Sequence, residues 1–144
     1  FTNYSLDFVT SRSRSIVGEV YGSAGNFYSG IIKSFSSSAT WVANQHLSLY
    51  ADFQHNNISL GSESFQTNEI GSRIQYDFST IVNSSLFTQW NNDLDQVLLN
   101  YRFNWQPKVG SNFYLVVNQL ISTRGKLQSK EFAILAKFVW LFIL

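Results

Sequence analysis

A serine, a histidine and an aspartate lie close together in the first half of the chain, and these are the side chains of nucleophilic hydrolysis. Ser48 would be the nucleophile, His46 the general base and Asp52 the residue that orients the base. On one face of a β-strand, however, side chains two positions apart are separated by about 7 Å, too far for a direct hydrogen bond. We therefore predict no catalytic residues, and a hydrolase is kept as an alternative.

Metal and cofactor chemistry is equally poorly supported. The two histidines, His46 and His55, have opposite parity on one predicted strand, so they point to opposite faces and cannot share a metal ion. The chain has no cysteine, which excludes disulfides, thiol catalysis and cysteine-based zinc sites. We predict neither a metal site nor a cofactor.

The composition is instead typical of a protein that faces lipid. The chain is 44% hydrophobic and 17% aromatic, while only 13% of its residues are charged, about half the usual share. No apolar run approaches the ~18 residues of a transmembrane helix. Apolar-out and polar-in strands with aromatic girdles account for this mixture. The net charge of +1, without a basic cluster, argues against a nucleic-acid partner.

The segment 131–144 shows the pattern most clearly, because both strand faces are apolar. One face carries Phe132, Ile134, Ala136, Phe138, Trp140, Phe142 and Leu144, and the other is aliphatic apart from Lys137. A strand of this kind would promote aggregation in a soluble protein. Alternating apolar residues that run to the last residue resemble the C-terminal signal of outer-membrane β-barrels.

Alternation and turn chemistry divide the rest of the chain into strands of about 10–14 residues, a length that suits tilted membrane strands. The phase of the sixth is ambiguous, because Leu86 and Phe87 compete for its apolar face. We predict an all-β fold, an antiparallel transmembrane β-barrel with about 8–10 strands, over residues 1–144. The predicted strands are 2–10, 15–22, 27–42, 46–58, 65–78, 81–90, 96–106, 111–122 and 131–144.

The predicted connections fall into two alternating sets. Segments 11–14, 43–45, 79–80 and 107–110 are tight, whereas 23–26, 61–64, 91–95 and 123–130 are longer or more polar. Short periplasmic turns and longer outer loops would place the C-terminus on the periplasmic side. Because bacterial barrels have even strand numbers, nine strands suggest the C-terminal part of a larger barrel with more strands before Phe1.

Two sets of side chains are candidates for function on the two faces. The polar residues would line the lumen, either as a selectivity lining or, as we favour, as pairs that fill the lumen. The tryptophans would form an interfacial girdle in preference to a sugar-stacking site. The lumen candidates are Asp7, Glu19, Asp52, Glu69, Arg73, Asp77, Arg102 and Lys137, and the girdle candidates are Trp41, Trp90, Trp105 and Trp140.

One segment resembles a known family. Arg102-Phe-Asn-Trp105, Pro107, Gly110-Ser-Asn112 and the strand Phe113–Asn118 are similar to the C-terminal barrel of outer-membrane proteins common in Bacteroidota. Those proteins carry an N-terminal carbohydrate-binding-like β-sandwich and a barrel of unknown function. The chain departs from the family pattern at Asn112, Val117 and Leu144. The resemblance implies a barrel and an outer-membrane location, and it transfers no catalytic residue.

Together these features predict a membrane anchor or passage in a bacterial envelope assembly that handles glycans or proteins. The expected location is the outer membrane of a Gram-negative bacterium. Expected partners are membrane lipid, lipopolysaccharide and other envelope subunits. Arg124, Lys126 and Lys130 could contact a partner or lipopolysaccharide phosphates, although a solvated loop is the default interpretation of 123–130. One alternative is an outer-membrane hydrolase. Another is a soluble lipocalin-like barrel for a small apolar ligand, with an apolar interior that would bury Phe132, Phe138, Phe103 and Tyr101.

Overall fold

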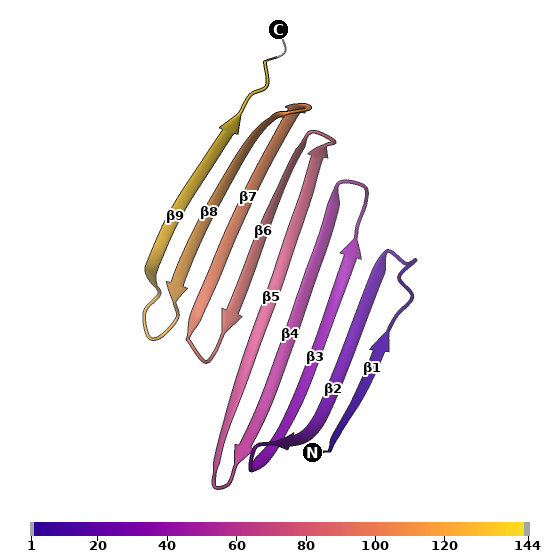
Figure 1. The fold of residues 1–144 in the computed structure, drawn as a ribbon, viewed down its shortest axis with the longest axis vertical. Helices are drawn as coiled ribbons and strands as arrows, with labels where there is room; N and C mark the ends of the chain where they lie inside the picture. The colour runs from indigo at the N-terminus through magenta and orange to yellow at the C-terminus, as the bar shows by residue number, and fades with distance from the viewer. Residues whose placement is uncertain (1, 143–144) are drawn as a thin grey trace.

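Alternating apolar and polar residues form nine β-strands that pair in chain order into one antiparallel sheet (Figure 1). The computed structural model describes residues 2–142. Across those residues there is no helix long and apolar enough to cross a membrane. The strands are β1 (Asn3–Val9), β2 (Ile16–Phe27), β3 (Gly30–Val42), β4 (Leu47–Leu60), β5 (Glu63–Ser79), β6 (Val82–Asn91), β7 (Gln96–Lys108), β8 (Ser111–Ser122) and β9 (Gln128–Val139).

The predicted all-β antiparallel class and the nine strands are confirmed, but the predicted turn at 23–26 is wrong. β2 continues to Phe27, and the chain reverses at 28–29, where Tyr28 adopts a positive φ of 51°. Gly25 serves a close approach between strands, because a Cβ there would lie 2.7 Å from the Asn3 Oδ1 atom. Small residues that suggest a turn therefore sit inside a ladder.

The predicted C-terminal strand is also wrong in its bounds. β9 begins at Gln128 and ends at Val139, and the following residues leave the sheet. The Leu141 amide donates a hydrogen bond to the Ser111 Oγ atom (3.0 Å), and the Leu141 side chain lies against Gly110. This contact folds the chain over the β7–β8 turn. Ile143 and Leu144, which the sequence assigns to the strand, lie outside the described residues.

The two edges where the strands turn do not differ in connection length as predicted. The upper edge of Figure 1 has connections 10–15, 43–46, 80–81 and 109–110, and the lower edge has 28–29, 61–62, 92–95 and 123–127. Each edge therefore combines two tight turns with two longer connections. The tight turns at 61–62 and 109–110 use the positive φ of Gly61 and Gly110.

The sheet is a single open layer. β1 pairs only with β2 and β9 only with β8, so the nine strands do not close into a barrel. Within residues 2–142 no hydrophobic side chain is buried, and Ser111, at 0% exposure, is the one fully buried side chain. The described structure therefore has no hydrophobic core, and the chemistry of its two faces carries the functional argument.

Candidate functional site on the polar face of the sheet

The pairing register sorts every strand residue onto one of two faces, because directly opposite residues project to the same side. We call one of them the apolar face. One register row is apolar on all eight strands that it crosses, and it places Leu86 on this face and Phe87 on the other. That row consists of Ile16, Trp41, Leu49, Ile74, Leu86, Tyr101, Val117 and Ile134.

The apolar face forms a band without charge. From the Phe53–Ile70 pair up to the Trp105–Phe113 pair, none of its described residues is charged. Two hydroxyls inside the band, those of Ser72 and Thr88, hydrogen-bond to each other at 2.7 Å. The band is nevertheless open to the surroundings, since Ile70 is 49% exposed.

Beyond the Phe53–Ile70 pair, the β4–β5 hairpin reverses the polarity of its two faces. The side that was apolar now carries His55, Asn57, Ser59, Ser64, Gln66 and Asn68, and the opposite side gains Ile58 and Phe65. His55 Nδ1 and Asn68 Oδ1 form a 2.7 Å hydrogen bond across the strands. This projecting hairpin extends furthest along the lower edge in Figure 1.

Three of the four predicted girdle residues belong to the apolar face and lie near its limits, and the fourth, Trp140, follows the last strand. Trp90 is directly opposite Ile70, at the lower boundary of the band. Trp41 and Trp105 are close to the upper ends of β3 and β7. Trp140 follows β9, stacks on Phe138 with ring centroids 5.8 Å apart, and lies 4.8 Å from the Lys108 ammonium.

The eight predicted lumen residues all lie on the other side of the sheet, the polar face. Carboxylates dominate β1–β4, and cations dominate β5–β9, with Glu69 and Asp77 on β5 as the exceptions. Within residues 2–142 no ion pair within 4.0 Å joins two members of this set. Glu19 instead contacts Arg12 from the 10–15 connection at 3.8 Å. The expected cross-pairing is thus not found among these residues.

An acidic hollow of about 310 Å³ lies on the polar face of β1–β4. Asp7, Glu19 and Asp52 line it together with tyrosine, serine and glutamine side chains. Asp52 lies over Gly71, which is directly opposite on β5. A Cβ at Gly71 would come within 2.3 Å of the Asp52 Oδ1 atom, so the glycine makes room for this carboxylate.

A second hollow, of about 420 Å³, lies on the polar face of β5–β8, and we call it the arginine hollow. Its cations are Arg73 and Arg102, and Gln75, Asn100 and Asn118 contribute amides. Sequence reasoning selected the arginines and missed the asparagines. Two signals identify these asparagines. Asn100 has the same parity as Arg102 on β7, and the register places Asn118 of β8 directly opposite Asn100.

The triad suggested by the sequence does not assemble. The His46 Nδ1 atom lies 2.6 Å from the backbone carbonyl oxygen of Asp77, and its Nε2 atom is 3.0 Å from the Gln45 amide. Ser48 and Asp52 stand on the polar face with Tyr50 between them. In the described part of the chain, His, Cys, Asp and Glu form no group of three that could hold a metal ion.

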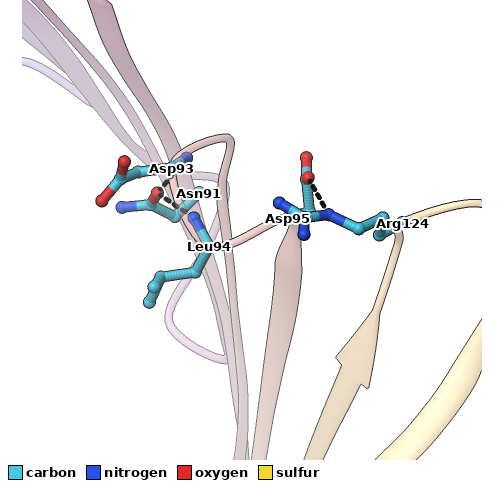
Figure 2. A network of polar contacts seen from close by, with 5 residues as sticks. All are labelled: Asn91, Asp93, Leu94, Asp95 and Arg124. Atoms are coloured by element: carbon cyan, nitrogen blue, oxygen red, sulfur yellow. Dashed lines mark hydrogen bonds and ion pairs between the residues drawn. The ribbon is translucent and has the colours of Figure 1, made fainter.

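The connections at the lower edge are held by local polar contacts (Figure 2). The Asn91 Oδ1 atom accepts hydrogen bonds from the amides of Asp93 (2.7 Å) and Leu94 (3.3 Å). Asp95 then accepts a hydrogen bond from Arg124 Nε at 3.1 Å, which links connection 92–95 to 123–127. Of the three cations that could meet lipopolysaccharide, Arg124 is thus already paired, while Lys126 and Lys130 are exposed.

Comparison with family models, curated proteins and solved structures gives no match for this chain.

Proposed function

We propose that the nine strands are part of the wall of a transmembrane β-barrel in the outer membrane of a Gram-negative bacterium. There the barrel serves as an anchor or passage in an envelope assembly that handles glycans or proteins. The observation that carries the proposal is a continuous apolar face, uncharged between the Phe53–Ile70 and Trp105–Phe113 pairs, on a single-layer sheet without a buried core.

A soluble sheet stabilises itself by burying one face against another layer, and exposed apolar patches on soluble monomers rarely exceed a few hundred Å². Here the apolar face extends over all nine strands and no described residue covers it. Hydrocarbon removes the penalty of that exposure. Water in a lumen would in turn solvate the carboxylates, arginines and amides of the polar face.

The apolar band crosses the sheet obliquely, as tilted membrane strands require. The apolar residues of β1 centre on Leu6, whose register row meets β5 at Asn68. The apolar residues of β9 centre at the level of Leu135, and the register row of Leu135 meets β5 at Gln75. Gln75 is seven residues along β5 from Asn68. Over eight strand steps this shift corresponds to a tilt of about 30°. Transmembrane barrels have tilts of ~35–45°.

The height of the band also suits a membrane. On β7 it extends from Val97 to Trp105. At ~3.4 Å per residue this is about 27 Å along the strand. The tilt reduces it to about 23 Å, close to the ~25 Å apolar band of outer-membrane barrels. Trp90 at one limit and Trp105 at the other match the interfacial preference of tryptophan.

The projecting hairpin supports a sidedness for the sheet. Its outer side becomes polar beyond the Phe53–Ile70 pair, so it would stand in water beyond the lipid. Strands and loops that extend past the membrane belong to the outer side of bacterial barrels. The lower edge would then be external, where Lys126 and Lys130 could contact lipopolysaccharide phosphates. The C-terminal end of β9 would face the periplasm.

The two free edges need partners in lipid. Backbone amides and carbonyls without hydrogen bonds cost several kcal/mol each in hydrocarbon. Further strands, from the same polypeptide or from another subunit, would therefore pair with β1 and β9. This requirement is the reason why we propose part of a barrel wall and not an independent barrel.

Single-cysteine labelling tests the assignment of the faces, because the chain has no native cysteine. Neighbouring residues on opposite faces form the matched pair Ile74→Cys and Gln75→Cys, and Asn57→Cys reports on the projecting hairpin. In outer membranes, we expect a membrane-impermeant maleimide to label Gln75→Cys and Asn57→Cys. Ile74→Cys should react only after the membrane is dissolved and the protein unfolded.

The opposite labelling pattern, with Ile74→Cys reactive and Gln75→Cys protected, would contradict the proposal. A soluble barrel with an apolar interior would label this pair in the same way as the membrane barrel does, so a second measurement has to separate those two. Cell fractionation with boiled and unboiled SDS gels is the companion measurement. A closed membrane barrel should be recovered with the outer membrane as a heat-modifiable band. A freely soluble protein would exclude it.

A further inference from the structure

We infer that the arginine hollow is a binding site for an oxyanion, a phosphate or carboxylate group carried by a small solute. The inference deepens the proposed function and rests on it, because it assumes that the polar face lines a passage. The hollow brings together Arg73 of β5 and Arg102 of β7, with β6 between them.

The register explains why the two arginines meet at one site. β5 and β7 are two strand spacings apart, about 10 Å. Arg102 is level with Gln75 through Ser85, so it lies only two residues along the sheet from Arg73. The hollow of about 420 Å³ between them has a mostly polar lining. It is large enough for a phosphate or carboxylate group together with part of its solute.

Both guanidinium groups are oriented by neutral neighbours. Arg102 Nε donates a 2.8 Å hydrogen bond to Asn100 Oδ1, and the Asn100 amide in turn donates to Asn118 Oδ1. The Arg73 guanidinium carbon lies 5.4 Å from the centre of the Phe87 ring, within cation–π range. These contacts hold the arginines while leaving most of their N–H donors unused.

The charge of the hollow is not neutralised by the residues that line it. No Asp or Glu is among them, and within residues 2–142 neither arginine has a carboxylate oxygen within 4.0 Å. Asp77, which lies near the hollow on β5, accepts weak hydrogen bonds of 3.3 Å from Gln75. Arginine binds phosphate and carboxylate through paired N–H donors, so an oxyanion complements this site.

The acidic hollow lies on the same face as the arginine hollow and has the opposite charge. Asp7, Glu19 and Asp52 lie on the same face but on β1–β4, and none of them lines the arginine hollow. An anionic solute would be repelled there and attracted to the arginine hollow. The two hollows differ in sign on one wall, so anions would concentrate at the arginine hollow and not at the acidic one.

The test is calorimetric titration of inorganic phosphate into the full-length protein, folded in zwitterionic detergent and free of lipopolysaccharide. We expect wild-type binding, weakened about 10-fold by Arg102→Gln, because charge-assisted hydrogen bonds are lost. Arg102→Lys keeps the charge but not the planar fork, and it should bind with intermediate strength. Lys33→Gln makes the same charge change on the opposite side of the sheet, where Lys33 lies directly opposite Asn57 of the projecting hairpin, and it should bind as the wild type does.

Several results would overturn the inference: no phosphate binding by the wild type, equal binding by Arg102→Gln, or equal weakening by Lys33→Gln. If the protein binds added lipopolysaccharide but not inorganic phosphate, the site belongs to a lipid headgroup and the free solute is rejected. The proposed function fails on a different readout. A heat-modifiable outer-membrane protein that does not bind phosphate removes this inference alone, whereas a soluble protein removes the passage itself.

Discussion

β4 and β5 pass through two regions whose polarity is opposite. In 47–53 and 70–76, one face is mostly apolar and the other polar. In 55–59 and 64–68 the first face is polar, and the apolar residues Ile58 and Phe65 stand on the other face beside Asn56 and Thr67. The register runs without a break from Leu47–Tyr76 to Leu60–Glu63, so no bulge causes the exchange. The sequence itself changes phase while the backbone continues.

This difference shows that alternation and environment are separate signals. A period of two specifies a strand in both regions, and the parity of the apolar residues specifies which side meets an apolar medium. A change of parity without a bulge marks the point where that medium ends. Here it ends at the Phe53–Ile70 pair, which Trp90 extends onto β6.

The largest expected effect comes from placing the same charge in each region. Ile74→Arg puts a cation in the middle of the apolar band, and we expect it to lower the free energy of unfolding by about 2–4 kcal/mol. Asn57→Arg, on the same side of the projecting hairpin, should change it by less than about 0.5 kcal/mol. Urea unfolding of the full-length protein in lipid vesicles, followed by tryptophan fluorescence, measures both. Equal losses would contradict a lipid boundary between the two sites.

A smaller effect tests whether the projecting region is as rigidly packed as the band. A Cβ at Gly30 would lie 1.8 Å from the Ser59 carbonyl oxygen, whereas a Cβ at Gly22 would meet nothing within 4 Å. Gly30→Ala should therefore destabilise the protein by about 1–3 kcal/mol through overpacking. Gly22→Ala is the matched control and should be close to neutral. If Gly30→Ala unfolds at the wild-type urea concentration, the hairpin is a mobile loop and not a wall.

The smallest effect concerns polar atoms inside the band. Ser72→Ala leaves the Thr88 hydroxyl without its 2.7 Å partner on the apolar face. We expect a loss of about 0.6 kcal/mol, the average for such hydrogen bonds in membranes. The double variant Ser72→Ala with Thr88→Val should recover part of the loss, because no hydroxyl is then unpaired. Additive losses in this double-mutant cycle would show that the two hydroxyls do not interact.

Much of the sheet was predictable from alternation alone. The nine strands and the antiparallel class follow from a period of two. The misses have local physical causes. Gly25 and Asn26 resemble a turn, but they lie within β2 and pair with the strands beside it. Leu141 lies outside the terminal strand, where its amide has the Ser111 hydroxyl as a partner. Which residues of β6 face the apolar side could be assigned only from the pairing register, since Leu86 and Phe87 are equally apolar. The arginine hollow needed it as well, because the hollow joins side chains from strands distant in sequence.

The order of the strands has a consequence for how the protein assembles. Every pairing in the described structure joins neighbours in the chain, so each forms by closing one hairpin with little loss of loop entropy. Pairing of the free edges of β1 and β9 would instead bring distant segments together. We therefore expect the hairpins to form early and the closing seam to form last, as the slow step of insertion.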